Sequence, residues 1–266
     1  MSALGIEGLN ANHADLAEVL ITLTADEWAM PSACAGWRVQ DVLAHITSNM
    51  KMMVNPDAPA ADAPADVKAE DAAEAMVAPR KAWTAAQLIA EYDEYLPGFV
   101  GALTSMQDEP MASMVIPLAD LGSHPMHILS DVFSFDHYCH LRHDMLGPAG
   151  PIARSLPAPD DTRIRPGVDW MIAGLPQMCR SALSGADRPW VLELTGAGAG
   201  TWTVQPVDST GLVTVLEGRE ASVGTVTSTA HDFVSWGTQR SNWRSSCALT
   251  GDTDYLADTL DAINII

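Results

Sequence analysis

The hydrophobic period changes once along this chain, and that change limits the folds that the chain can adopt. Up to about residue 185, apolar residues recur every three or four positions, the spacing that places them on one face of a helix. Beyond that point, short segments of alternating apolar and polar residues are separated by glycine, as in strands joined by turns. The sequence therefore predicts a helical domain at residues 1–185 and a small α+β domain at residues 186–266.

The first domain is expected to consist of helices joined by irregular segments. Apolar residues at helical spacing mark residues 6–29, 37–53, 85–104, 124–146 and 168–183. Pro97 should either end or kink the third of these helices. Residues 54–80 are rich in alanine, proline and acidic residues, which is typical of a long surface loop or a frayed helix. Residues 147–167, with many prolines and glycines, are expected to be irregular.

The second domain should combine strands and helices. Alternating segments predict strands at residues 190–196, 200–207 and 212–218, whereas residues 228–238 and 253–266 have helical spacing.

The net charge argues against two classes of partner. Acidic residues outnumber basic ones 34 to 14, which gives a formal charge of −20. A surface this negative repels the phosphates of nucleic acids and anionic membranes, so neither is expected as a partner. The same charge raises the local concentration of cations, including divalent metals.

The cysteines and the apolar segments indicate a protein of the cytoplasm. The four cysteines are far apart and form no C-x-x-C pair, so a disulfide framework is not expected. The first residues do not resemble a signal peptide, and no apolar segment is long enough to span a membrane. A cytoplasmic location is therefore predicted, and a monomer is the default expectation for its state.

The segment S-F-D-H-Y-C-H-L-R-H-D, residues 134–144, contains three of the eight histidines of the chain. On a helix, Asp136 and His140 lie one turn apart and point in the same direction, on the side that also carries Phe133. That side should face the interior of the bundle. A buried carboxylate and imidazole need a charged partner, and a metal ion would supply one.

A third ligand is expected from another helix. His45 lies beside the apolar stripe of residues 37–53, so it is the natural candidate. Two histidines and one carboxylate suit zinc, and also nickel, iron or manganese. Three protein ligands would leave one position open, as catalytic metal sites do.

Structural explanations remain open for the same residues. The spacing D-x-x-x-H is common, and a buried His45 can simply be a core histidine with satisfied hydrogen bonds. We expect His137 and His143 to be exposed, and Cys34 and Cys139 to act as small hydrophobic residues.

Two motifs of this chain resemble a known family. G-W-R-V-Q-D-V-L-A-H-I, residues 36–46, resembles the opening motif of the DinB-like domain in mycothiol-dependent maleylpyruvate isomerases. In that family the motif W-x-V-x-D-V-x-x-H carries the first metal ligand, which corresponds to His45. A later acid-x-x-x-His motif corresponds to Asp136 and His140. The usual acid of the family is glutamate, and aspartate is shorter by one methylene group.

The end of the chain extends the resemblance over nearly the whole sequence. H-D-F-V-S-W-G-T-Q-R, residues 231–240, is similar to the family's W-x-x-x-R segment, and residues 249–266 are similar to its closing segment. The resemblance implies a DinB-like four-helix bundle followed by a sterol-carrier-like α+β domain. It also implies that Arg240 reaches toward the thiol or the substrate. The alternative for Arg240 is a surface arginine that pairs with an acid.

The function implied by the resemblance is metal-dependent thiol chemistry. A divalent metal, zinc in the first place, would activate mycothiol for addition to an electrophile such as an activated alkene or an epoxide. Release of the thiol would give isomerisation, and its retention would give S-transfer. Two alternatives differ in class: a non-catalytic metal or small-ligand binding protein or carrier, and a purely structural bundle.

Overall fold

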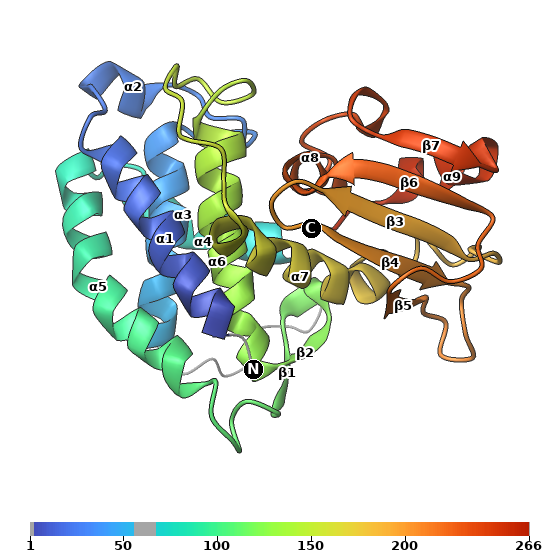
Figure 1. Cartoon of the computed structure of the whole chain (residues 1–266). Coiled ribbons are helices and arrows are strands. Elements are labelled where there is room, and N and C mark those ends of the chain that lie inside the picture. Colours follow the sequence, from blue (N-terminus) through green and yellow to red (C-terminus); the bar gives the residue numbers. More distant parts are fainter. Residues whose placement is uncertain (1–2, 56–67, 266) are drawn as a thin grey trace. The chain divides into compact units, whose positions relative to one another are not determined.

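The computed structural model describes residues 3–55 and 68–265. The chain forms two compact units, Met1–Pro157 and Ala158–Ile266 (Figure 1). The order of a helical domain followed by a small domain with a sheet confirms the predicted fold class.

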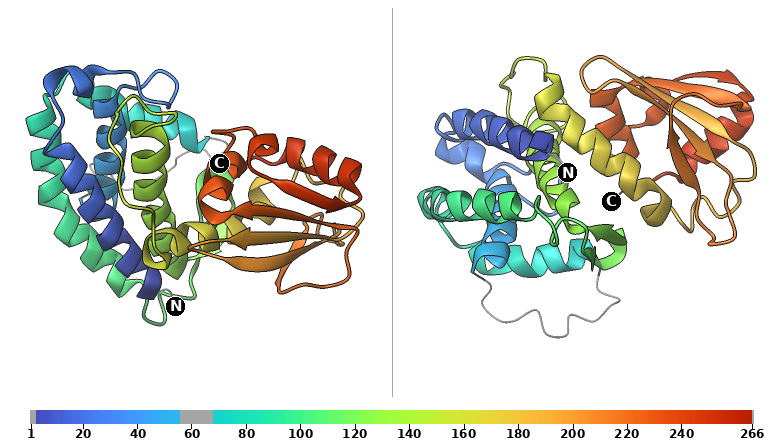
Figure 2. Two further views of the ribbon diagram at one scale, coloured as in Figure 1. Left: turned by 45° about the horizontal axis from the view of Figure 1, so that its top comes forward. Right: turned by 60° about the horizontal axis from the view of Figure 1, so that its bottom comes forward.

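The first unit is a helix bundle. Its long helices pack in pairs, α1 along α6 and α3 along α5 (Figure 2). Their bounds are α1 Ala3–Leu20, α3 Val39–Val54, α5 Ala85–Ser105 and α6 Leu129–Cys139. Shorter elements join them: α2 Ala25–Ala29, α4 Ala69–Val77, the hairpin of β1 Val115–Pro117 and β2 Ser123–Pro125, and the 3₁₀ turns Ala78–Arg80, Ala119–Leu121 and Met126–Ile128.

Local capping and proline residues shift several helix boundaries from their predicted places. The segment predicted as one helix over 6–29 is divided, because Thr24 and Glu27 form a capping box that starts α2. Residues 124–128 form the end of the hairpin and a 3₁₀ turn instead of the start of a helix. Helix α5 continues through Pro97 to Ser105.

The acidic segment predicted as a loop or a frayed helix lies partly outside the described residues. Its second part forms α4 and the 3₁₀ turn Ala78–Arg80. The segment is therefore helical over Ala69–Val77. Residues 56–67 lie outside the part that the structure describes.

Polar contacts fix α1 against α6 inside the apolar core. Leu9 and Leu16 of α1 are fully buried. Between them, Asn12 Nδ2 donates hydrogen bonds to the carbonyl and the hydroxyl of Ser134, each at 3.2 Å. Arg142 pairs with Asp15 at 2.7 Å, with both side chains largely buried. Because these contacts are directional, they fix the rotation of α6 about its own axis.

The second unit is a mixed sheet with three helices in its described part. The strand order is β5-β4-β3-β6-β7, and the β3–β6 pair is parallel while the other pairs are antiparallel. The strands are β3 Trp190–Thr195, β4 Gly200–Gln205, β5 Thr214–Glu217, β6 Gly224–Thr229 and β7 Ala248–Gly251. Helices α8 Ala230–Gly237 and α9 Thr253–Ala262 pack against the sheet.

Helix α7, Asp161–Met178, differs from the sequence prediction in two ways. It begins seven residues before residue 168, within a segment predicted to be irregular, because the Asp160 side chain accepts the Arg163 N–H and caps the first turn. It also packs against α8 and β5, so the boundary between the units lies at Pro157–Ala158 and not near residue 185.

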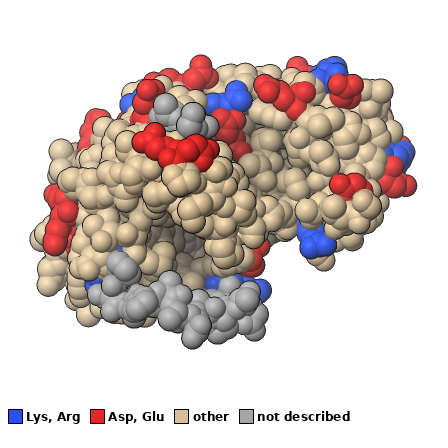
Figure 3. All heavy atoms as spheres, turned by 90° about the horizontal axis from the view of Figure 1, so that it is seen from below, with Lys and Arg blue, Asp and Glu red and all other residues tan. Residues whose placement is uncertain are grey.

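On the face that Figure 3 shows, acidic side chains occur singly or in small groups, with lysine or arginine beside several of them. Surface ion pairs of the molecule include Lys81 with Glu74 and Arg244 with Asp261. Among the described helices, none has both the length and the apolar character that crossing a membrane requires.

The close approach of α1 to α6 gives a stability prediction. A Cβ atom added at Gly5 would lie 2.4 Å from Ser130 Oγ and 2.8 Å from Ser130 Cβ. The helices would have to separate, so we expect Gly5→Ala to lower the free energy of unfolding by about 1–3 kcal/mol. Urea unfolding followed by circular dichroism measures the change.

Gly101 is the matched control, since it also lies in a helix but a Cβ there meets no atom within 4 Å. Gly101→Ala should leave stability unchanged or raise it by up to about 1 kcal/mol. Equal stability of the Gly5→Ala and wild-type proteins would contradict the tight packing of α1 on α6.

Candidate metal centre

Helix α3 places His45 at the edge of an apolar stripe. Val42, Leu43 and Ile46 are buried in the core, whereas the His45 side chain keeps 13% of its exposure. The start of the helix is fixed by Asp41, whose carboxylate accepts the Arg38 N–H and pairs with the Arg38 guanidinium, each at 2.9 Å. Because this cap sets where α3 begins, it also sets which way His45 points.

Asp136 lies in helix α6, and His140 is the first residue after the end of that helix. The chain then winds as a π-helix over His140–Met145, and the Leu146 N–H donates to the Leu141 carbonyl, five residues back, at 3.0 Å. Single π turns inside helices often mark functional sites.

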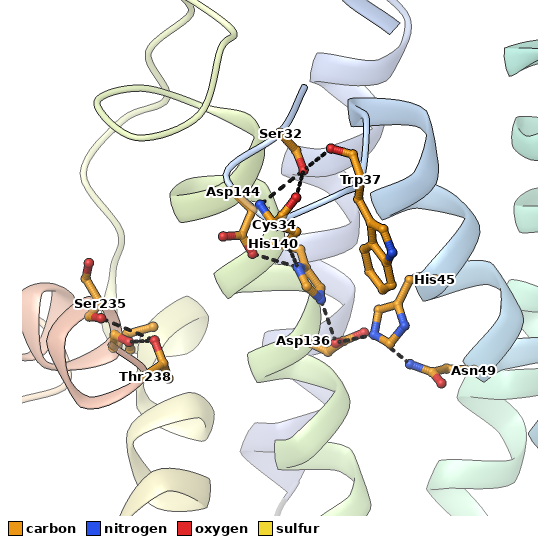
Figure 4. A network of polar contacts seen from close by, with 11 residues as sticks. Ser32, Cys34, Trp37, His45, Asn49, Asp136, His140, Asp144, Ser235 and Thr238 are labelled. Carbon is orange, nitrogen blue, oxygen red and sulfur yellow. Dashed lines mark hydrogen bonds and ion pairs between the residues drawn. The ribbon is translucent and has the colours of Figure 1, made fainter. Parts of the chain in front are cut away.

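The structure brings His45, Asp136 and His140 together from the two helices. Asp136 Oδ1 lies 3.3 Å from His45 Nε2 and 3.3 Å from His140 Nε2. Figure 4 shows both rings pointing toward this carboxylate. The centroids of the two rings are 5.0 Å apart in an edge-to-face arrangement. The three donor atoms all lie within 4.8 Å of one another, so one ion can contact all of them.

The electrostatics of the cluster are those of a buried ion pair. Burial by itself would raise the pKa of Asp136, but the charges and hydrogen bonds of His45 and His140 hold it well below its usual value. Burial would likewise lower the pKa of His140, yet Asp136, Asp144 and Cys34 hold it well above its usual value. Asp136 is therefore a carboxylate, the form that binds cations.

One atom of the cluster suggests that an ion completes it. Asp136 Oδ2 is buried and has no hydrogen-bond partner among the described residues. Such atoms are rare in native proteins and call for an explanation, which an ion at the carboxylate would supply. In a tetrahedral site, two ligand atoms about 2.1 Å from the metal lie about 3.4 Å apart. The two 3.3 Å separations at Asp136 Oδ1 match that spacing, so this donor set fits a divalent metal.

Trp37 and Asn49 lie beside the His45 ring. The Trp37 ring lies 5.2 Å from the His45 ring, and its Nε1 donates to Glu74 at 2.7 Å. Asn49 Nδ2 lies 3.2 Å from His45 Nε2. These neighbours restrict the movement of the imidazole.

Sequence reasoning gave Asp144 no role and Cys34 only a packing role, yet both contact the cluster. Asp144 Oδ2 lies 2.7 Å from His140 Nδ1, and Cys34 Sγ lies 3.8 Å from the same nitrogen. The repeat of Asp136, His140 and Asp144 at intervals of four residues was a visible signal for Asp144. For Cys34 no signal was available, because a loop brings it to the site.

The prediction that His137 and His143 are exposed was wrong. Their residues are only 1% and 6% exposed. His137 Nδ1 donates to the Phe133 carbonyl at 2.9 Å, and its Nε2 accepts from the Tyr92 hydroxyl at 3.0 Å. Burial lowers the pKa of His137 to about 4, so its ring is neutral at pH 7. His143 packs near the Tyr138 ring. Cys139 is buried, as predicted for a small hydrophobic residue.

Arg240 lies in the second unit, three residues after the end of α8. Its backbone N–H donates to the Ser235 carbonyl at 2.8 Å, and the residue is half-buried. The flanking Trp236 and Trp243 are core residues whose ring N–H groups donate to Ser228 and Asp261. The role of Arg240 toward a ligand stays a prediction.

Comparisons with known proteins bear on the family and the fold of this chain. Residues 9–132 match the family model described as "Mycothiol maleylpyruvate isomerase N-terminal domain", a range that includes His45 and ends before Asp136. No curated protein matches the chain.

Two solved structures share the fold over most of the chain. They are crystal structures of the mycothiol-dependent maleylpyruvate isomerase and of a histidine-to-alanine mutant of it. Their sequence identities to this chain are 14% and 13%, and each has a TM-score of 0.56. Each match covers 92% of this chain and 91% of the other.

The geometry of the cluster predicts one bound metal ion that depends on two separate helices. We expect about one equivalent of divalent metal in the purified protein after incubation with zinc. His45→Ala and Asp136→Ala should each lose it, since either change removes one of only three protein ligands. Elemental mass spectrometry measures the metal content.

His127→Ala serves as the control, because His127 lies just before α6 and contacts the Ala112 carbonyl, outside the cluster. It should keep its metal. Retention of the full metal content by Asp136→Ala would exclude the proposed ligand set.

Proposed function

We propose that this chain is a metal-dependent enzyme that uses a small-molecule thiol, because residues 9–132 match the family model of mycothiol maleylpyruvate isomerase N-terminal domains. The proposed thiol is mycothiol, and the proposed reaction is addition of the thiol to an electrophile. Release of the thiol gives isomerisation, and retention gives S-transfer. The observation that carries the proposal is the convergence of His45, Asp136 and His140 on one point.

In this proposal His45, Asp136 and His140 hold the metal through two imidazole nitrogens and one carboxylate oxygen. When bound, a divalent metal supplies the positive charge that lowers the pKa of a coordinated thiol. Zinc is the proposed metal, with nickel, iron and manganese as alternatives that the same donors accommodate. Three protein ligands leave a position open for the thiol.

The surroundings of the cluster contribute in two ways. Among the three proposed ligands only Asp136 is charged, so a divalent ion keeps one uncompensated charge in its ligand shell, which favours an anionic thiol. The Asp144 carboxylate, 2.7 Å from His140 Nδ1, offsets part of that charge from outside the ligand shell. The Trp37 ring packs beside the His45 ring and restricts its movement, whereas Asn49 Nδ2 lies 3.2 Å from Nε2, the atom that a metal would take in this proposal. No nucleophilic side chain of the protein is needed, because the thiol itself attacks.

Arg240 is proposed to bind a carboxylate of the thiol or of the substrate. Its guanidinium can donate two parallel hydrogen bonds to a carboxylate, which a lysine cannot. The proposed substrate class is an electrophilic alkene next to a carbonyl group, or an epoxide.

The proposed setting is the cytoplasm, and the proposed state is a monomer. None of the four cysteines, all of which the structure describes, is in a disulfide, which suits a reducing compartment.

A carrier is the second candidate function, because the second unit has an open pocket on its surface. This pocket of about 320 Å³ is lined in part by Leu183, Ala186, Tyr255 and Thr259. Stoichiometric binding of a small ligand, with no turnover of any thiol acceptor, would support the carrier over the enzyme.

The enzymatic proposal predicts metal-dependent turnover. We expect the zinc-loaded protein, with mycothiol, to convert maleylpyruvate, the substrate in the names of the two similar structures, to its trans isomer or to a thiol adduct. Removing the metal with a chelator should abolish the reaction, and adding zinc should restore it. Ultraviolet absorbance follows the isomerisation, and mass spectrometry detects the adduct.

Glutathione in place of mycothiol is the comparison that tests the thiol. Equal rates with both thiols would contradict mycothiol as the specific cosubstrate. Absence of turnover with a panel of alkenes and epoxides, in protein that holds its metal, would contradict the enzyme.

The role of Arg240 predicts a change in KM. A hydrogen bond to a charged group contributes about 1.5–3 kcal/mol, so Arg240→Ala should raise KM about tenfold or more. Arg240→Lys should recover part of the loss, because it keeps the charge but not the paired donors. Steady-state kinetics with varied thiol and varied electrophile shows which of the two Arg240 binds.

Arg244→Ala is the control, since Arg244 lies on the same unit and pairs with Asp261 on the surface. Its KM values should equal those of the wild type. Unchanged KM values in Arg240→Ala would leave this arginine with a structural role only.

A further inference from the structure

Asp144 lies on the side of the His140 ring that faces away from Asp136. Its Oδ2 is 2.7 Å from His140 Nδ1, while Asp136 Oδ1 is 3.3 Å from His140 Nε2. The imidazole therefore has one carboxylate at each nitrogen (Figure 4). Asp144 is only 1% exposed, so its carboxylate is removed from solvent.

The two distances indicate different kinds of contact. Two ligands of one tetrahedral metal lie about 3.4 Å apart, which fits the separation on the Nε2 side. A separation of 2.7 Å is that of a hydrogen bond between an N–H and a carboxylate. The Nδ1 side of His140 thus makes the short hydrogen bond, while the longer separation at Nε2, which a hydrogen bond can also span, has the length expected between two ligands of one ion.

A second contact holds Asp144 in place. The backbone leaves the π-helix at Leu146, and the Asp144 carbonyl accepts the N–H of Ala33 at 3.0 Å. This bond ties the end of the π-helix to the loop that carries Cys34. The position of Asp144 is therefore fixed by its backbone as well as by its side chain.

We propose that Asp144 is a positioning residue for the metal centre, which rests on the proposed metal-dependent function. A neutral imidazole carries its proton on one nitrogen only. By accepting the Nδ1–H, Asp144 keeps the proton on that side, so the lone pair of Nε2 points at the metal. It also fixes the orientation of the ring and makes the histidine a stronger ligand.

A competing arrangement uses the same atoms. Cys34 Sγ, His140 Nδ1 and Asp144 Oδ2 also lie close enough together to bind an ion on the Nδ1 side of the ring. The 2.7 Å contact argues against it, because co-ligands of one ion are farther apart. In that arrangement Cys34 would be a thiolate ligand, which gives the test a spectroscopic readout.

Zinc affinity is the measurement that tests the proposal. Purified metal-free proteins are titrated with zinc in competition with a chromogenic chelator. We expect Asp144→Ala to bind zinc about 10–100-fold more weakly than the wild type, the usual effect of losing such a partner. Asp144→Asn should lose less, since its amide oxygen can still accept the Nδ1–H.

Asp15→Asn is the matched control. Asp15 is also a buried carboxylate, and it pairs with Arg142 of the same π-helical segment. We expect this variant to lose thermal stability and to keep its zinc affinity. Circular dichroism tests whether each metal-free variant is folded. A folded variant with weaker zinc binding has lost the orientation of a ligand, and not the fold.

Two results would overturn the proposal. One is an Asp144→Ala protein that binds zinc as tightly as the wild type. If the alanine variant does not fold, the same result with Asp144→Asn has the same meaning. The other is a thiolate-to-metal band in the spectrum of the cobalt-loaded wild type without added thiol, which would make Cys34 a ligand.

The tautomer of His140 gives a direct check. The ¹H–¹⁵N spectrum of the histidine rings in the zinc-loaded protein should show His140 with its proton on Nδ1. Failure of the proposed function has a different signature, because the wild-type protein itself would then bind no zinc.

Discussion

The helical unit is organised around the contact of one largely buried carboxylate, that of Asp136, with two imidazole rings. A carboxylate in the interior is costly unless charges or hydrogen bonds compensate it. His45 and His140 do so only while α3 and α6 keep their spacing and rotation. The polar contacts between α1 and α6, and the cap of α3, hold that arrangement. The bundle therefore stabilises a site that would be unfavourable in isolation.

The three residues at the centre could be named from the sequence because helical spacing pairs two of them and the motifs of the similar family point to all three. Asp136 and His140 are one helical turn apart, and His45 lies at the edge of a strongly apolar stripe. What surrounds them was not predictable to the same degree. His137 is buried because α5 supplies Tyr92, and Cys34 reaches His140 because the loop before α3 folds over the end of α6. Both facts depend on tertiary packing, which periodicity does not contain.

The domain boundary shows the same limit at a larger scale. The hydrophobic period changes near residue 185, where helices give way to strands, but α7 packs with the strand unit. The hydrophobic period of a segment indicates whether it forms a helix or a strand, but not which other element it packs against. Strands β6 and β7 were missed for a related reason: β6, G-T-V-T-S-T, has Val226 as its one large apolar residue, and pairing with β3 places it inside the sheet.

The aspartate at position 136 is shorter than the glutamate that is usual in the family that the sequence motifs resemble, yet it reaches both histidines equally. Its Oδ1 is 3.3 Å from each Nε2 atom, so the shorter side chain does not open the cluster. The donor set of two nitrogens and one oxygen is kept. What the shorter side chain changes is the distance from the α6 backbone to any ion at this site. Since these donors suit several divalent metals, selectivity among them would depend on that geometry more than on ligand type.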